Sequence, residues 1–104
     1  MNPYRSQIMR DLAQDSPHCF LCKKPNDGTV VGCHSNAISD GHGVSHKSHD
    51  LLAFLCDKCH KYIDEHWKEP RVQEDFYHCV YDTTIWLLQG GYLTVKRMPK
   101  KWQE

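Results

Sequence analysis

Hydrophobic residues recur at helical spacing in two parts of the chain. The longer part begins at Pro70 and stops at Gly90-Gly91. Its apolar stripe consists of Val72, Phe76, Val80, Thr83 and Leu87. This spacing predicts an amphipathic helix over residues 70–90 whose stripe faces the core. A shorter pattern, with apolar residues four apart behind a proline, predicts another helix over residues 3–14.

Short apolar runs between and after these segments favour strands. The runs are TVVGCHSN at 29–36, LLAFL at 51–55 and YLTVK at 92–96. Residues 57–68 follow the second run and have helical spacing, with Ile63 and Trp67 one turn apart. Residues 36–50 have little periodicity and predict a long loop. The order of elements predicts a small α+β fold.

The length of 104 residues predicts a single domain over residues 1–104. Its expected parts are an N-terminal helix in 1–16, a central unit in 17–68, the long helix in 70–90, and a C-terminal strand with a basic tail in 91–104. Thirteen basic and thirteen acidic residues cancel, so no global field would draw the chain to an acidic partner. With no apolar run long enough for a secretory signal or a membrane span, we expect a cytoplasmic protein that does not bind membranes.

The six cysteines include two CxxC pairs, Cys19/Cys22 and Cys56/Cys59. Two residues between cysteines let a tight turn place both sulfurs about 2.3 Å from one zinc ion. Two such pairs in a reducing compartment therefore predict a structural zinc ion held by four thiolates. The same pairs are also compatible with redox dithiols, and Cys56 to His60 matches the CxxCH pattern of haem attachment. Zinc explains both pairs at once.

Two histidines lie close to the CxxC pairs in the sequence. His34 ends the first predicted strand, and His60 follows Cys59 on the first turn of a predicted helix. In chain order the features are a CxxC pair, a strand that ends in a histidine, a loop, a short strand, a second CxxC pair and a helix with a histidine. The order of these features resembles the HNH, or ββα-metal, endonuclease superfamily. Within it, the chain is most similar to small prophage-encoded nucleases of the YbcO type. The matching stretches are VVGCHSN, the DG-containing loop, HDLLAFLCDKCHKYID and GGYLTV, within residues 17–97.

The resemblance implies a zinc-stapled ββα-metal (HNH-like) domain with flanking helices, and an enzyme that cleaves DNA phosphodiester bonds. It implies that His34 is the general base and that His60 holds a catalytic divalent ion, Mg²⁺ or a transition metal. The polar residue that orients the base in this family would be Asn36 or Asp50. DNA is the expected partner.

One residue departs from the family pattern. Many members carry an aspartate or histidine ligand directly before the catalytic histidine, whereas this chain has Cys33, and a thiol favours zinc over magnesium. The second ligand is therefore left open among Asp50, Asp64 and a loop histidine, and His34 is left open as a ligand instead of a base. A non-catalytic zinc module that binds DNA or a protein partner is the alternative function.

Overall fold

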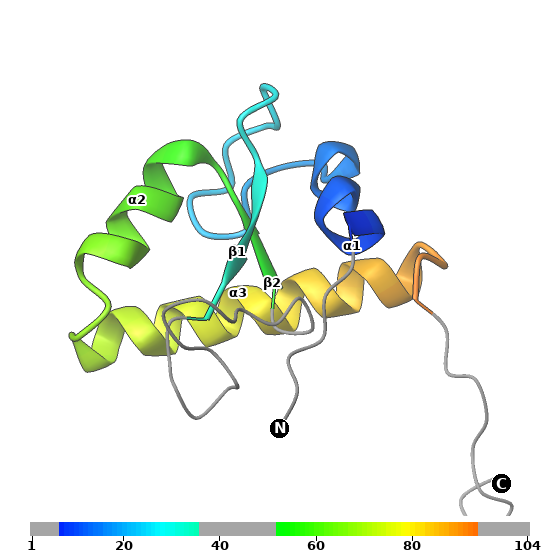
Figure 1. Ribbon diagram of the computed structural model, residues 1–104. Helices are drawn as coiled ribbons and strands as arrows, with labels where there is room; N and C mark the ends of the chain where they lie inside the picture. The colour runs from blue at the N-terminus through cyan, green and yellow to red at the C-terminus, as the bar shows by residue number, and fades with distance from the viewer. Residues whose placement is uncertain (1–6, 36–51, 94–104) are drawn as a thin grey trace, which may run out of the picture.

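The computed structural model describes residues 7–35 and 52–93, which form a small α+β fold (Figure 1). In chain order the elements are helix α1 (Gln7–Asp11), 3-10 helix η1 (Leu12–Asp15), strand β1 (Val31–His34), strand β2 (Leu52–Leu55), helix α2 (Asp57–Glu65) and helix α3 (Pro70–Gln89). The two strands pair antiparallel, with Val31 opposite Leu55 and His34 opposite Leu52. Figure 1 shows α3 running across the strand pair, with α2 and α1 on opposite sides of the strands. The predicted α+β class is confirmed.

Helix α3 confirms the long helix predicted from the apolar stripe. It begins at Pro70 and ends at Gln89, and the stripe is buried together with Cys79. Its C-terminus is closed by Gly91 with φ of 77°, while the Tyr92 N–H donates to the Leu87 carbonyl over 2.9 Å. Glycine adopts this left-handed conformation without steric cost, and the hydrogen bond from Tyr92 satisfies a carbonyl that the helix leaves open.

Three sequence predictions differ from the described structure. In the described residues, the N-terminal segment is helical from Gln7 to Asp11 and then tightens into η1, rather than continuing as one α-helix to residue 14. Helix α2 ends at Glu65 instead of Lys68 because Pro70 forces an extended backbone on Glu69, so a turn must separate the two helices. Tyr92 and Leu93 belong to the cap of α3 and not to a strand, while residues 94–96 lie outside the described residues.

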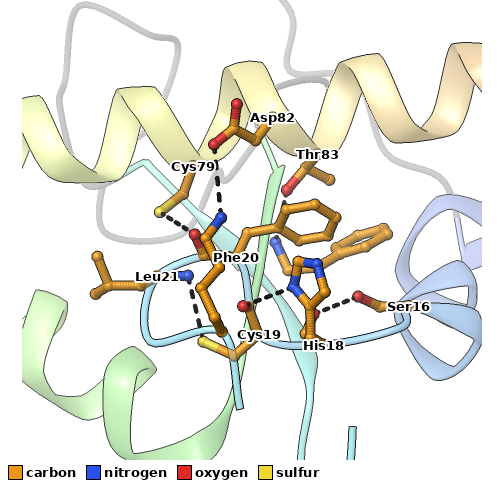
Figure 2. A network of polar contacts seen from close by, with 10 residues as sticks. Ser16, His18, Cys19, Phe20, Leu21, Cys79, Asp82 and Thr83 are labelled. Atoms are coloured by element: carbon orange, nitrogen blue, oxygen red, sulfur yellow. Dashed lines mark hydrogen bonds and ion pairs between the residues drawn. The ribbon is translucent and has the colours of Figure 1, made fainter. Parts of the chain in front are cut away.

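Strand β2 forms the centre of the core. All its residues from Leu52 to Leu55 are buried. The backbone of Phe54 is satisfied on the side away from β1: its N–H donates to Thr83 Oγ1 over 3.2 Å, and its carbonyl accepts the Phe20 N–H over 3.0 Å. The Cys79 thiol in turn donates to the Phe20 carbonyl at 3.5 Å, as Figure 2 shows from close by. The open edge of the sheet is thus covered by α3 and by the segment that carries the first CxxC pair.

Among the helices of the described residues, none combines the length and the apolar character needed to cross a lipid bilayer.

Candidate metal centre

The first cysteine pair lies in a compact loop before β1. The Cys19 N–H donates to the Lys24 carbonyl over 2.9 Å, and the Lys23 N–H donates to the Cys19 carbonyl over 3.0 Å. Lys23 adopts a φ of 66°, which bends the chain sharply after Cys22. His18 and Pro25 form an isolated antiparallel bridge that closes the base of the loop. This turn aims the two thiols of the pair toward the same point.

The first loop is fastened to the rest of the molecule on both sides. Asn26 donates from its side-chain amide to the Ser16 carbonyl over 2.9 Å, and its Oδ1 accepts the Gly28 N–H over 2.9 Å. Gly28 has a φ of 95°, a left-handed conformation that glycine adopts without steric cost, and the chain bends there. Ser16 and Cys19 are both buried, and His18 holds the Cys19 carbonyl with Nδ1 at 2.9 Å (Figure 2).

The second cysteine pair spans the start of α2. Cys56 directly precedes the helix, and Cys59 lies within its first turn. The N-terminal end of a helix carries partial positive charge from its unpaired N–H groups, which favours thiolates there. Because β2 leads straight into α2, the buried strand fixes where both of these sulfurs lie.

The structure brings the two pairs together, as the spacing predicted. The Sγ atoms of Cys19, Cys22, Cys56 and Cys59 all lie within 4.8 Å of one another. The Cys22 and Cys56 sulfurs are 3.9 Å apart, and tetrahedral zinc with bonds of about 2.3 Å requires sulfur separations of about 3.8 Å. The donor set and its spacing therefore fit a zinc ion. Four thiolates would fill its coordination shell, which is typical of a structural site.

Local hydrogen bonds prepare one sulfur for metal binding. Burial alone would raise the pKa of Cys19, but backbone N–H groups of Cys56, Cys22 and Leu21 point at the sulfur and lower its pKa to about 7. The Leu21 N–H lies 3.4 Å from this sulfur. Burial and the neighbouring thiols raise the pKa of Cys59. One thiolate is thus available near neutral pH, and a cation is needed to hold the others close to it.

The remaining two cysteines are not part of this centre. Cys33 and Cys79 are buried, and burial raises the pKa of both thiols, that of Cys79 to about 12. They remain protonated and act as small apolar side chains. A protonated, buried thiol at position 33 is a poor ligand for a catalytic metal ion.

The two predicted catalytic histidines occupy different settings. His34 ends β1, is half-buried, and has its Nε2 atom enclosed by protein. His60 lies on the exposed side of α2, where its Nε2 is 3.1 Å from Asp64 Oδ2, one turn along the helix. Asn36 and Asp50 lie outside the described residues. Within residues 7–35 and 52–93, the four cysteines are the only group of three or more metal-ligating side chains gathered at one point.

The sequence analysis did not single out the tyrosines on the outer side of α3. Tyr77 reaches the end of β1, where its hydroxyl is 3.2 Å from Ser35 Oγ. Tyr81 follows one turn later and is 64% exposed. Their spacing of four residues on the polar side of the helix was the available signal.

Comparisons of the chain with protein-family models, with curated proteins and with solved structures found no match. The function must therefore be argued from the site.

Proposed function

We propose that this chain is a metal-dependent nuclease that hydrolyses phosphodiester bonds in DNA. The observation that carries the proposal is the arrangement around the four-cysteine centre. An antiparallel strand pair runs directly into a helix, with His34 at the end of the first strand and His60 on the first turn of the helix. This agrees with the resemblance to the HNH superfamily that the motifs suggest.

The four cysteines have a structural role in this proposal. They join the loop before β1 to the start of α2, and a structural zinc ion can supply much of the folding free energy of a small domain. The ion would hold the end of β2 and the first turn of α2 rigidly, and so fix the position of His60. A rigid support is what a reactive histidine requires.

His60 and Asp64 are the residues proposed to hold the catalytic divalent ion. Their Nε2 and Oδ2 atoms are 3.1 Å apart and both side chains are half-exposed, so both can turn toward a common ion. Imidazole with carboxylate suits Mn²⁺, Fe²⁺ or Ni²⁺, and carboxylate suits Mg²⁺. When bound, such an ion stabilises the negative charge that develops on the phosphate oxygens. Asp64 takes the ligand role that the buried Cys33 cannot fill.

His34 is proposed as the general base. A neutral imidazole has one ring nitrogen without a proton, and this atom can accept a proton from the attacking water. The neighbouring Ser35, which is fully buried and bonded to Tyr77, holds the end of β1 in place beside it. The end of β1 therefore holds His34, the proposed general base, in a fixed position.

A zinc-stabilised binding module without catalysis is the second candidate. The burial of His34 Nε2 favours it, because a general base must expose a ring nitrogen to water. In that function the domain held together by the four cysteines would bind DNA or a protein partner through its surface. His34 and His60 would then not act together in catalysis.

Plasmid nicking separates the two functions. The zinc-loaded protein is assayed with Mg²⁺, Mn²⁺ and Ni²⁺ in turn, beside His34→Ala and His60→Ala. His66→Ala is the matched control, because His66 is also a half-exposed α2-end histidine paired with a carboxylate, Glu69, at 2.7 Å. Nicking that is lost in the first two variants and kept in the control, at equal zinc content, supports the nuclease. Absence of nicking by the wild type with every metal supports the binding module.

A further inference from the structure

A groove runs along the outer side of α3, away from the core. It is a shallow hollow of about 470 Å³ that is open to solvent, and the described residues that line it are Glu74, Tyr77, His78 and Tyr81. We propose that the groove is a subsite for an unpaired nucleobase of the polynucleotide substrate, an inference that rests on the proposed nuclease function.

The two tyrosines form the aromatic part of the groove. They are one helical turn apart and are 38% and 64% exposed. The Tyr77 ring is held edge-on by Trp67 at 6.2 Å and Phe76 at 5.4 Å, measured between ring centroids. A ring fixed in this way loses little conformational freedom on binding, so stacking of a base against the pair is favourable. Tyr81 supplies the more accessible face.

The groove is joined to the proposed catalytic site by a hydrogen bond. Ser35, which follows His34 at the end of β1, lies with its Oγ 3.2 Å from the Tyr77 hydroxyl. The aromatic surface therefore begins beside the residue proposed as the general base. A strand whose phosphate lies at His34 would have the neighbouring base within reach of this surface.

The polar groups of the groove fit a base better than a phosphate. The described lining residues include a carboxylate and an imidazole but neither lysine nor arginine. A carboxylate repels phosphate, whereas it accepts hydrogen bonds from the exocyclic amino groups of cytosine, adenine and guanine. Glu74 is thus the residue that would read the edge of the base.

Binding of short single strands tests the subsite. Fluorescently labelled (dC)8 and (dT)8 are titrated with zinc-loaded protein, without other divalent ions, so that no cleavage intervenes. Loss of a stacked base costs about 1–3 kcal/mol, so Tyr81→Ala should weaken binding of both strands by about 5- to 150-fold. Tyr81→Phe, which keeps the ring, should bind within about twofold of the wild type. Tyr62→Ala is the control, since Tyr62 is 45% exposed on α2 and outside the groove.

Glu74→Gln tests the reading of the base edge. Cytosine presents an amino group where thymine presents a carbonyl, so replacing the carboxylate by an amide should lower the ratio of (dC)8 to (dT)8 affinity several-fold. Failure of the wild type to bind either strand, or equal binding by Tyr81→Ala and Tyr62→Ala, would overturn the subsite. Tyr81-dependent binding without nicking under any metal would reject the nuclease and leave the subsite standing. Nicking combined with unchanged binding by Tyr81→Ala would reject the subsite alone.

Discussion

Replacing Thr83 by valine tests how α3 is fastened to the sheet. Thr83 is fully buried, and its Oγ1 accepts the Phe54 N–H over 3.2 Å. Valine has nearly the same shape but no acceptor, so the Phe54 N–H would remain buried without a partner. An orphaned buried donor costs about 1–3 kcal/mol. We expect the free energy of unfolding of Thr83→Val to fall by that amount.

The measurement is urea unfolding of zinc-saturated protein, followed by circular dichroism. Thr84→Val is the matched control, because the Thr84 hydroxyl donates to the Val80 carbonyl at 2.8 Å within the same helix. In Thr84→Val the backbone N–H of residue 84 still donates to that carbonyl. Loss of the Thr84 hydroxyl should therefore change the free energy of unfolding by less than about 0.5 kcal/mol. Equal losses of unfolding free energy in the two variants would refute the view that the Thr83 hydroxyl stabilises the edge of β2.

Three further predictions concern the cysteines. Elemental analysis should find one zinc ion per chain, lost in Cys56→Ser and retained in Cys33→Ala; zinc loss in the latter would place Cys33 in the centre. Because the raised pKa values of Cys22 and Cys59 leave those thiols protonated in the metal-free fold at neutral pH, zinc binding should release protons and strengthen as pH rises. Calorimetry in buffers of different ionisation enthalpy measures this release, and a pH-independent affinity would contradict it. After chelation, alkylation followed by mass spectrometry should modify exposed Cys22 early and buried Cys33 and Cys79 late, since burial raises the pKa of both buried thiols, that of Cys79 to about 12; early modification of Cys79 would show that α3 detaches without metal.

The elements that could be predicted from sequence are those with strong local signals. Helix α3 combines a proline at its start, a regular apolar stripe and two glycines after its end, and the structure reproduces these limits. Strand β2 was visible because a continuous apolar run needs burial on all sides. Local steric preference and periodic burial act together in both cases.

The failed predictions lie where local signals compete. The apolar spacing of Ile63 and Trp67 favours a helix through Lys68, yet the extended backbone before Pro70 ends α2 at Glu65. The run that begins at Tyr92 has strand-like composition, but its first N–H groups are used to close α3. Hydrogen bonds that a neighbouring element requires outweigh the weaker preference of a short segment.

The candidate site divides in a similar way. The spacing of the CxxC pairs predicted a four-thiolate cluster, and the structure confirms that the sulfurs meet. No spacing rule says whether His34 faces solvent or protein, or that Tyr77 reaches Ser35 from a helix 42 residues away. Those relations depend on how α3 crosses the sheet.

The sequence by itself determined the limits of α3, the runs that form β1 and β2, and the two CxxC pairs that come together, because each follows from residue type and spacing over a few neighbouring positions. Only the tertiary structure decided that α3 and the loop with the first CxxC pair cover the edge of β2, that burial raises the pKa of Cys33, and that Tyr77 on α3 reaches Ser35 after the end of β1. The physical reason is that burial, pKa and side-chain reach depend on segments distant in the chain, whose packing is selected collectively by the core and cannot be read from any one of them.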